Sequence, residues 1–155
     1  MAVQLVKSTG LPDAWKRTEA ARGPDVEGFR AHLEKRTFDG YCDAATWRLL
    51  VEHGTRVCSL DEKGAGVAVD MELETRSVAN ELALLSEMGA VLRQFSEKDK
   101  KLDAKERSDA IQYVCRPKPG YSKGLRYDVA EAFVTDFCRQ NGVKVKVGIF
   151  KWAVP

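Results

Sequence analysis

The sequence predicts a mainly helical α+β domain in which about six helices surround a small antiparallel sheet. Apolar residues recur every three or four positions over residues 77–96 and again after Asp128, which is the period of an amphipathic helix. Apolar and polar residues alternate over 67–74 and 143–150, which is the period of a strand with one buried face. Because the chain has 155 residues, we expect one globular domain spanning residues 1–155.

The composition is that of a folded globular chain. It is 44% hydrophobic and 31% charged with a net charge of +2, which excludes a wholly disordered or collagen-like protein. No apolar run approaches the roughly 18 residues of a membrane span, and the first residues lack the apolar stretch of a secretory signal. The four cysteines then indicate buried thiols rather than disulfides. We therefore expect a cytoplasmic location and no membrane partner.

Three short helices are expected before the first strand. One is opened by Leu11-Pro12-Asp13 and covers residues 13–22, and a second covers residues 25–36 with apolar residues at helical spacing. A third helix begins after Asp43, a good N-cap residue, and ends at Gly54.

The predicted antiparallel sheet is built from residues 55–60, 67–74 and 143–150. A short link containing Gly64 joins the first two segments, which suits a hairpin. The alternative is that residues 67–74 begin the next helix.

Helix 77–96 has the longest apolar face and is expected to be the most buried. Asp103 and Glu106 have the spacing of a capping box, which predicts a helix that ends before Pro117.

Residues 116–124 contain two prolines and two glycines and are expected to form a loop. The last helix is expected to begin at Asp128 and to end at Gly142. No repeat with a period of 20–50 residues is visible in the sequence.

The sequence offers no catalytic motif. The two histidines are His32 and His53, and His53 lies five residues before Cys58, so that a thiolate–imidazole pair is conceivable. However, Cys58 falls in a predicted strand, and free cysteines are commonly buried. The cysteines lack zinc-ligand spacing, the acidic residues lack calcium-loop order, and the glycines lack a phosphate-loop context. We assign no catalytic residue, metal or cofactor.

The carboxyl-terminal quarter is the basic part of the chain. Residues 116–155 carry eight Lys and Arg against three Asp and Glu, whereas residues 1–115 carry 17 against 20. Cations beside aromatic rings suit contact with nucleic acid. The candidate contact residues are Arg116, Lys118, Tyr121, Lys123, Arg126, Lys144, Lys146, Phe150 and Trp152.

Two other interpretations explain the lysines on the last strand without a ligand. Lys144 and Lys146 can protect an exposed sheet edge from unwanted pairing. They can also form cross-strand pairs with the carboxylates of Asp70, Glu72 or Glu74.

A protein partner is the favoured interpretation. A small chain without a catalytic centre, but with three tryptophans and a terminal strand, suits strand addition or helix docking onto another protein. Trp152 is the expected anchor, whereas Trp15 and Trp47 are expected in the core. We therefore predict a non-enzymatic cytosolic binding or regulatory protein that acts through its C-terminal strand and helical surface. The alternative is a nucleic-acid-binding protein that uses region 116–152.

Overall fold

The computed structural model describes residues 24–155, so the predicted helix 13–22 and Trp15 lie outside the described residues. Within that range the helices are α2 (Val26–Arg36), α3 (Ala44–Cys58), α4 (Glu62–Thr75), α5 (Glu81–Ser96), α6 (Ala104–Cys115) and α7 (Tyr127–Asn141). The strands are β1 (Tyr41–Cys42), β2 (Ala79–Asn80), β3 (Lys101–Leu102), β4 (Lys144–Lys146) and β5 (Trp152–Ala153). The mainly helical α+β class is confirmed. None of the helices in residues 24–155 is both long and apolar enough to cross a membrane.

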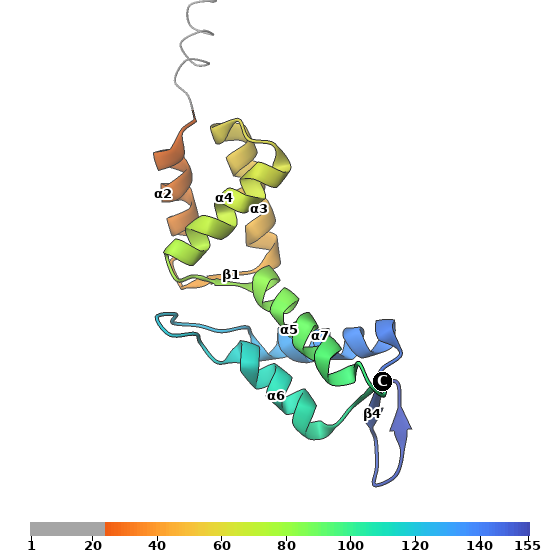
Figure 1. The fold of residues 1–155 in the computed structure, drawn as a ribbon. Helices are drawn as coiled ribbons and strands as arrows, with labels where there is room; N and C mark the ends of the chain where they lie inside the picture. Colours follow the sequence, from red (N-terminus) through yellow and green to blue (C-terminus); the bar gives the residue numbers. More distant parts are fainter. Residues whose placement is uncertain (1–23) are drawn as a thin grey trace, which may run out of the picture.

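The helices form two halves, each around its own apolar core (Figure 1). Helices α2, α3 and α4 surround a core that includes Leu33, Leu50 and Val69. Helices α5, α6 and α7 surround a second core that includes Met88 and Leu92. Helix α5 buries more of its residues than any other described helix.

Four helices end in the same way. Each is followed by a residue in the left-handed region and then by a short strand. The left-handed residues are Gly40, Ser77, Lys100 and Gly142, with φ of 81°, 54°, 55° and 63°. Such a residue satisfies carbonyl groups at a helix end and redirects the chain.

The strands that follow pair in parallel, once in each half. Strand β1 pairs with β2, and β3 pairs with β4, so that Tyr41 lies opposite Ala79 and Lys101 opposite Lys144. In both pairs an amide bonds to the carbonyl of a left-handed residue, at 2.9 Å from Ala79 to Gly40 and at 2.8 Å from Lys144 to Lys100. The predicted antiparallel sheet is therefore wrong, and only the added strand β5 pairs antiparallel, with β4.

The two halves are an internal structural repeat. Buried residues of α3 recur in α6 at 60 positions further along, and those of α4 recur in α7 at 65 positions further along. The corresponding pairs are Leu50 and Ala110, Val51 and Ile111, Ala65 and Ala130, Val69 and Val134, and Leu73 and Cys138. The offset grows because the α6–α7 loop is longer than the α3–α4 turn. This repeat is longer than the periods considered from the sequence.

The predicted strand 67–74 is wrong, because these residues belong to α4. Val69 and Leu73 are four positions apart and buried, whereas Val67 and Met71, which would share their side of a strand, are exposed. A pattern with an apolar residue at every second position also has one at every fourth position. Two apolar residues four positions apart lie on one face of a helix, so the same pattern fits a helix. The alternative that residues 67–74 are helical is correct, but they do not begin the next helix, because α4 ends at Thr75 and α5 begins at Glu81.

The predicted strand 55–60 is also wrong, because α3 passes through Gly54 and ends at Cys58. Gly54 lies against both neighbouring helices, and a Cβ atom there would sit 3.3 Å from the Phe29 ring of α2 and 3.4 Å from the Ala65 methyl group of α4. The glycine therefore permits close helix packing instead of ending the helix.

The predicted helix ends were more accurate than the strands. Asp43 caps α3, and Asp103 and Glu106 form a complete capping box at the start of α6. Gly142 follows α7 as predicted. Asp128 is not the cap of α7, because the helix begins one residue earlier and Arg126 holds the cap position without a side-chain bond.

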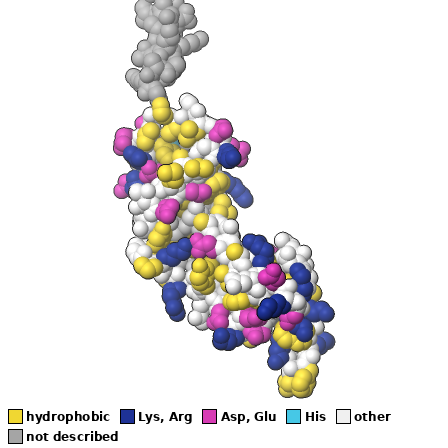
Figure 2. All heavy atoms as spheres, in the orientation of Figure 1, with side chains coloured by type: hydrophobic (Ala, Val, Ile, Leu, Met, Phe, Trp, Pro, Cys, Tyr) yellow, Lys and Arg dark blue, Asp and Glu magenta, His cyan; other side chains and the backbone are white. Residues whose placement is uncertain are grey.

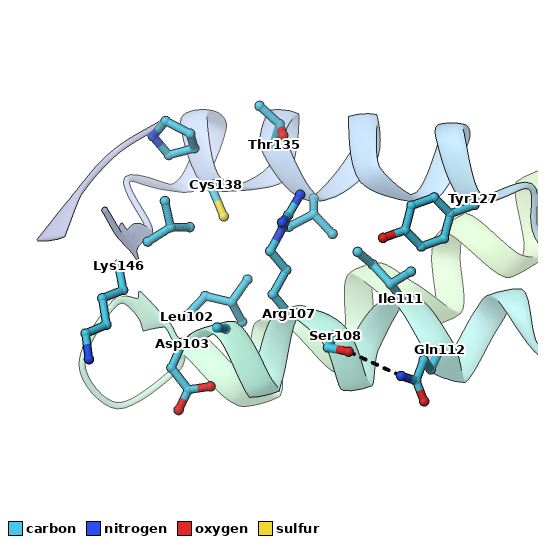
Figure 3. Close-up of a pocket in the computed structure, with 14 residues that line it drawn as sticks. Leu102, Asp103, Arg107, Ser108, Ile111, Gln112, Tyr127, Thr135, Cys138 and Lys146 are labelled. Atoms are coloured by element: carbon cyan, nitrogen blue, oxygen red, sulfur yellow. Dashed lines mark hydrogen bonds between the residues drawn. The ribbon is translucent and has the colours of Figure 1, made fainter. Parts of the chain in front are cut away.

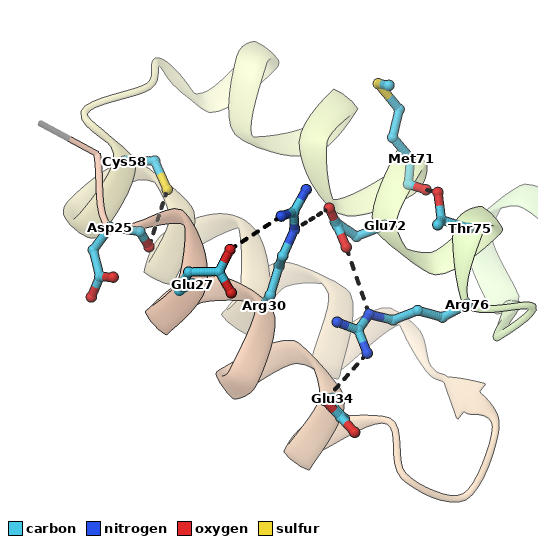
Figure 4. Close-up of polar contacts among 9 residues, drawn as sticks. All are labelled: Asp25, Glu27, Arg30, Glu34, Cys58, Met71, Glu72, Thr75 and Arg76. Atoms are coloured by element: carbon cyan, nitrogen blue, oxygen red, sulfur yellow. Dashed lines mark hydrogen bonds and ion pairs between the residues drawn. The ribbon is translucent and has the colours of Figure 1, made fainter.

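The predicted acidic strand face instead supplies an ion-pair cluster between α2 and α4 (Figure 4). The Glu72 carboxylate lies 2.8 Å from Nε of Arg30 and 3.6 Å from Nε of Arg76. Arg76 also reaches Glu34 on α2, at 3.3 Å. One carboxylate between two guanidinium groups therefore fastens the outer faces of α2 and α4.

Residues 116–126 form a loop, here called the strap, that returns from α6 to the junction of the two halves (Figure 1). Leu125 is buried, and its amide bonds to the Val114 carbonyl at 2.8 Å. Gly124 lies against the end of α6, where a Cβ atom would collide with the Cys115 carbonyl group and lie 2.8 Å from the Val114 oxygen. The backbone approach at this point requires glycine.

Gly124→Ala should lower the free energy of unfolding by about 1–3 kcal/mol, because the added methyl group meets rigid helix backbone. Chemical denaturation measures the change. Gly148→Ala is the matched control, since the nearest atom to its Cβ is 3.9 Å away, and it should change stability by less than about 0.5 kcal/mol. Equal stability of the two variants would contradict the tight approach.

Candidate interaction surface

The structure divides the predicted contact residues into two separate groups. Arg116, Lys118, Tyr121, Lys123 and Arg126 belong to the strap, which precedes α7, whereas Lys144, Lys146, Phe150 and Trp152 follow α7. A helix of 15 residues is about 22 Å long. Figure 1 shows the two groups at opposite ends of α7, so they do not form one continuous basic face.

Three strap cations are paired with the protein's own carboxylates. Lys118 lies 2.7 Å from Glu87 of α5, Lys123 lies 3.2 Å from Asp39 in the first half, and Arg126 lies 2.7 Å from Asp128. Hydrogen bonding to Glu87 raises the pKa of Lys118, and hydrogen bonding from Lys123 lowers the pKa of Asp39. Tyr121 is half-buried and Arg116 is exposed. Of these three ion pairs, the one between Lys123 and Asp39 joins the strap to the first half.

The carboxyl-terminal residues form a β-hairpin instead of the single strand 143–150. Lys146 of β4 lies opposite Trp152 of β5, which places their side chains on one face of the sheet. The ammonium group of Lys101, on β3, lies 5.2 Å from the centre of the Trp152 ring. Trp152 is thus half-buried at the base of the hairpin, and the predicted anchor is already in contact with a cation.

The hairpin ends in three exposed apolar side chains, here called the apolar tip. Val147 is 55% exposed, Ile149 is 78% exposed and Phe150 is 93% exposed. Figure 2 shows a hydrophobic cluster at the end of the second half, where the hairpin projects. A bond of 2.9 Å from the Val147 amide to the Lys151 carbonyl closes the turn beneath the tip. The tip is therefore presented on a hydrogen-bonded base.

Lysines flank the apolar tip on both strands. Lys144, Lys146 and Lys151 are exposed, and none of them forms an ion pair with any residue of the described range 24–155. The predicted cross-strand pairs with Asp70, Glu72 or Glu74 are wrong, because these acids lie on α4 in the other half. The hairpin thus combines an apolar end with a cationic border.

The thiols are not arranged for nucleophilic chemistry. All four cysteines are free, and burial raises the pKa of each thiol, for Cys42 to about 12. Cys58 lies on the same helix as His53 and directs its sulfur to the Asp25 carbonyl at 3.9 Å. Among the described residues no group of three or more His, Cys, Asp or Glu side chains could hold a metal ion.

The two histidines stack on each other between α2 and α3. The ring centres of His32 and His53 are 4.0 Å apart, with an angle of 23° between the planes. Burial lowers the pKa of His32, and the facing His53 and the nearby Arg36 add to this effect. The pair therefore favours a neutral His32 in the folded state.

Acidification should destabilise the protein through this pair. The pKa of His32 is lower in the folded state than its ordinary value of 6.5, so the unfolded state binds more protons below about pH 6.5. The melting temperature should therefore fall between about pH 7.5 and about pH 5.5. In His32→Gln this fall should be smaller, and an unchanged pH profile would contradict the role of the stack. Thermal denaturation followed by circular dichroism measures both.

The predicted strand 143–150 runs through Gly148, where the structure has the turn of the hairpin. A glycine between two alternating apolar segments is a signal for a short hairpin loop, and here it precedes Ile149 and Phe150. Ile149 belongs to the apolar tip and not to a buried strand face.

Comparison with known proteins yields no relative for this chain. No protein-family model, no curated protein and no solved structure matches it.

Proposed function

We propose that the protein is a non-enzymatic binding protein that docks onto another protein through its C-terminal hairpin. The observation that carries this proposal is the apolar tip, in which Phe150 is 93% and Ile149 is 78% exposed. Exposed large apolar side chains gathered at one place are typical of interaction sites, because water contact with them is unfavourable.

The hairpin also has the features of a docking element. Its base is part of the three-stranded sheet β3-β4-β5, so the tip is held in place before a partner binds. Phe150 supplies a large aromatic group of the kind that anchors protein interfaces. The partner surface that fits is an apolar pocket bordered by carboxylates, because lysines border the tip.

The test is affinity capture followed by binding measurements with the captured protein after purification. Phe150→Ala should raise the Kd by about 30-fold or more, since it removes the central anchor. Phe38→Ala is the matched control, because Phe38 is 87% exposed but lies in the first half. A partner that binds both variants as tightly as the wild type would sink the proposal.

Nucleic-acid binding through region 116–152 is the second candidate. Lys101, Lys146 and Trp152 on one face of the sheet favour it. The strap does not favour it, because Lys118, Lys123 and Arg126 already form ion pairs with carboxylates of the protein.

If nucleic acid binds, the salt dependence should be modest. With only about three cations, such as Lys144, Lys146 and Lys151 of the hairpin, meeting phosphates, affinity should fall about 40-fold between about 50 and 200 mM salt, instead of about 10³-fold for six. Mobility shifts with generic DNA and RNA over this range measure the slope. The absence of a shift at low salt would remove the candidate.

A further inference from the structure

The second half contains a pocket between α6 and α7 (Figure 3). Its volume is about 410 Å³, within the range of about 300–1,000 Å³ typical of ligand sites. Buried apolar side chains form its floor: Leu102, Ile111, Val134 and Cys138. Tyr127 lies at one end and Lys146 at the other, and Arg107 extends across the middle.

In the first half an indole ring fills the corresponding place. Trp47 lies on α3 at the position that Arg107 holds on α6, and its ring lies against Gly66 of α4. The indole N–H donates to the Asp70 carboxylate at 2.7 Å. The Asn80 amide donates to the same carboxylate oxygen at 2.9 Å, so ring, carboxylate and strand β2 together close the groove.

In the second half the groove keeps its floor and loses its ring. Arg107 replaces Trp47, Glu131 replaces Gly66, and Thr135 replaces Asp70. Arg107 reaches Glu131 at 3.4 Å, with both side chains 42% exposed, and pairs this exposed stabilise little. The guanidinium group can therefore move aside when a ring enters.

The remaining polar groups suit an incoming indole. The Thr135 hydroxyl donates to the Glu131 carbonyl at 3.2 Å, and its oxygen still has a lone pair to accept an N–H at the place of the Asp70 oxygen. The Arg107 guanidinium can stack on the face of the ring. Lys146 at the rim, and Arg107 itself, favour acidic residues beside the aromatic one.

We infer that the α6–α7 pocket binds a tryptophan side chain, flanked by acidic residues, from a partner polypeptide. The second half thereby receives from another chain the ring that the first half supplies from its own α3. This inference does not depend on the apolar tip.

The test is an NMR titration of the full chain, labelled with ¹⁵N, with the peptide acetyl-Glu-Glu-Trp-Glu-Glu-amide. We expect saturable shifts at the amides of Ile111, Thr135 and Cys138. The same peptide with Ala for Trp, or with Lys for each Glu, should bind at least about tenfold more weakly. No saturable shift at these amides, or equal affinity for the Ala peptide, overturns the inference.

A transplant variant gives the second half the closing pair of the first. Arg107→Trp combined with Thr135→Asp should fill the pocket and abolish the saturable shifts. Lys105→Trp is the control, because it adds the same ring to α6 at a side chain that is 85% exposed, and binding should persist. Retained binding in the transplant variant overturns the inference.

Thr135→Val decides the question if the transplant variant does not fold. It should weaken the Trp peptide about fivefold by removing the acceptor, and leave a Phe peptide unchanged because that ring has no N–H. Equal effects on both peptides overturn the indole assignment. If Trp15→Ala binds the peptide more tightly than the wild type, the Trp15 side chain of the protein itself competes for the pocket. That result would overturn the inference that the ring comes from a partner. Phe150→Ala should not change peptide binding, so that this site and the hairpin fail independently.

Discussion

The fold depends on how its helices end and restart. In each half, two helices are followed by a left-handed residue, and the two short segments that come next pair in parallel. Cys42 and Leu102 lie in these pairs and are almost completely buried. Buried peptide groups outside helices must find partners, and the short ladder supplies them. The ladder therefore fixes where α3 and α6 begin, and thereby which helix faces meet.

The two halves share the same helices and parallel strand pair but present different surfaces, because a helix follows β2 and a hairpin turn follows β4. After β2 the chain turns at once into α5, where the buried Glu81 accepts bonds from the Tyr41 hydroxyl at 2.6 Å and the Ala44 amide at 3.2 Å. The corresponding residue in the second half is Lys146, the last residue of β4, which is exposed. The first half is thus closed by its own polar contacts, whereas the second presents a groove and a projecting tip.

The sequence predicts every described helix except α4, because the ends of those helices carry local chemical signals. Asp43 and the Asp103–Glu106 pair act within one turn, so tertiary contacts do not alter them. The pattern at 67–74 is ambiguous, because Val69 and Leu73 fit both a strand and a helix face, and packing decides between them. The repeat is hidden for a similar reason, since corresponding core positions hold different residues of suitable size, such as Leu73 and Cys138.

The count of charges along the sequence overestimates the free basic surface where folding brings cations and carboxylates together. The strap supplies most of the excess positive charge of residues 116–155. However, Lys118 and Lys123 form ion pairs with Glu87 and Asp39, which are distant in sequence. A count of charges cannot reveal such pairs. The hairpin lysines, which form no ion pair within residues 24–155, border both the apolar tip and, through Lys146, the α6–α7 pocket. If the proposed function holds, a partner with an acidic surface would therefore meet both sites from the same end of the molecule, away from the closed first half.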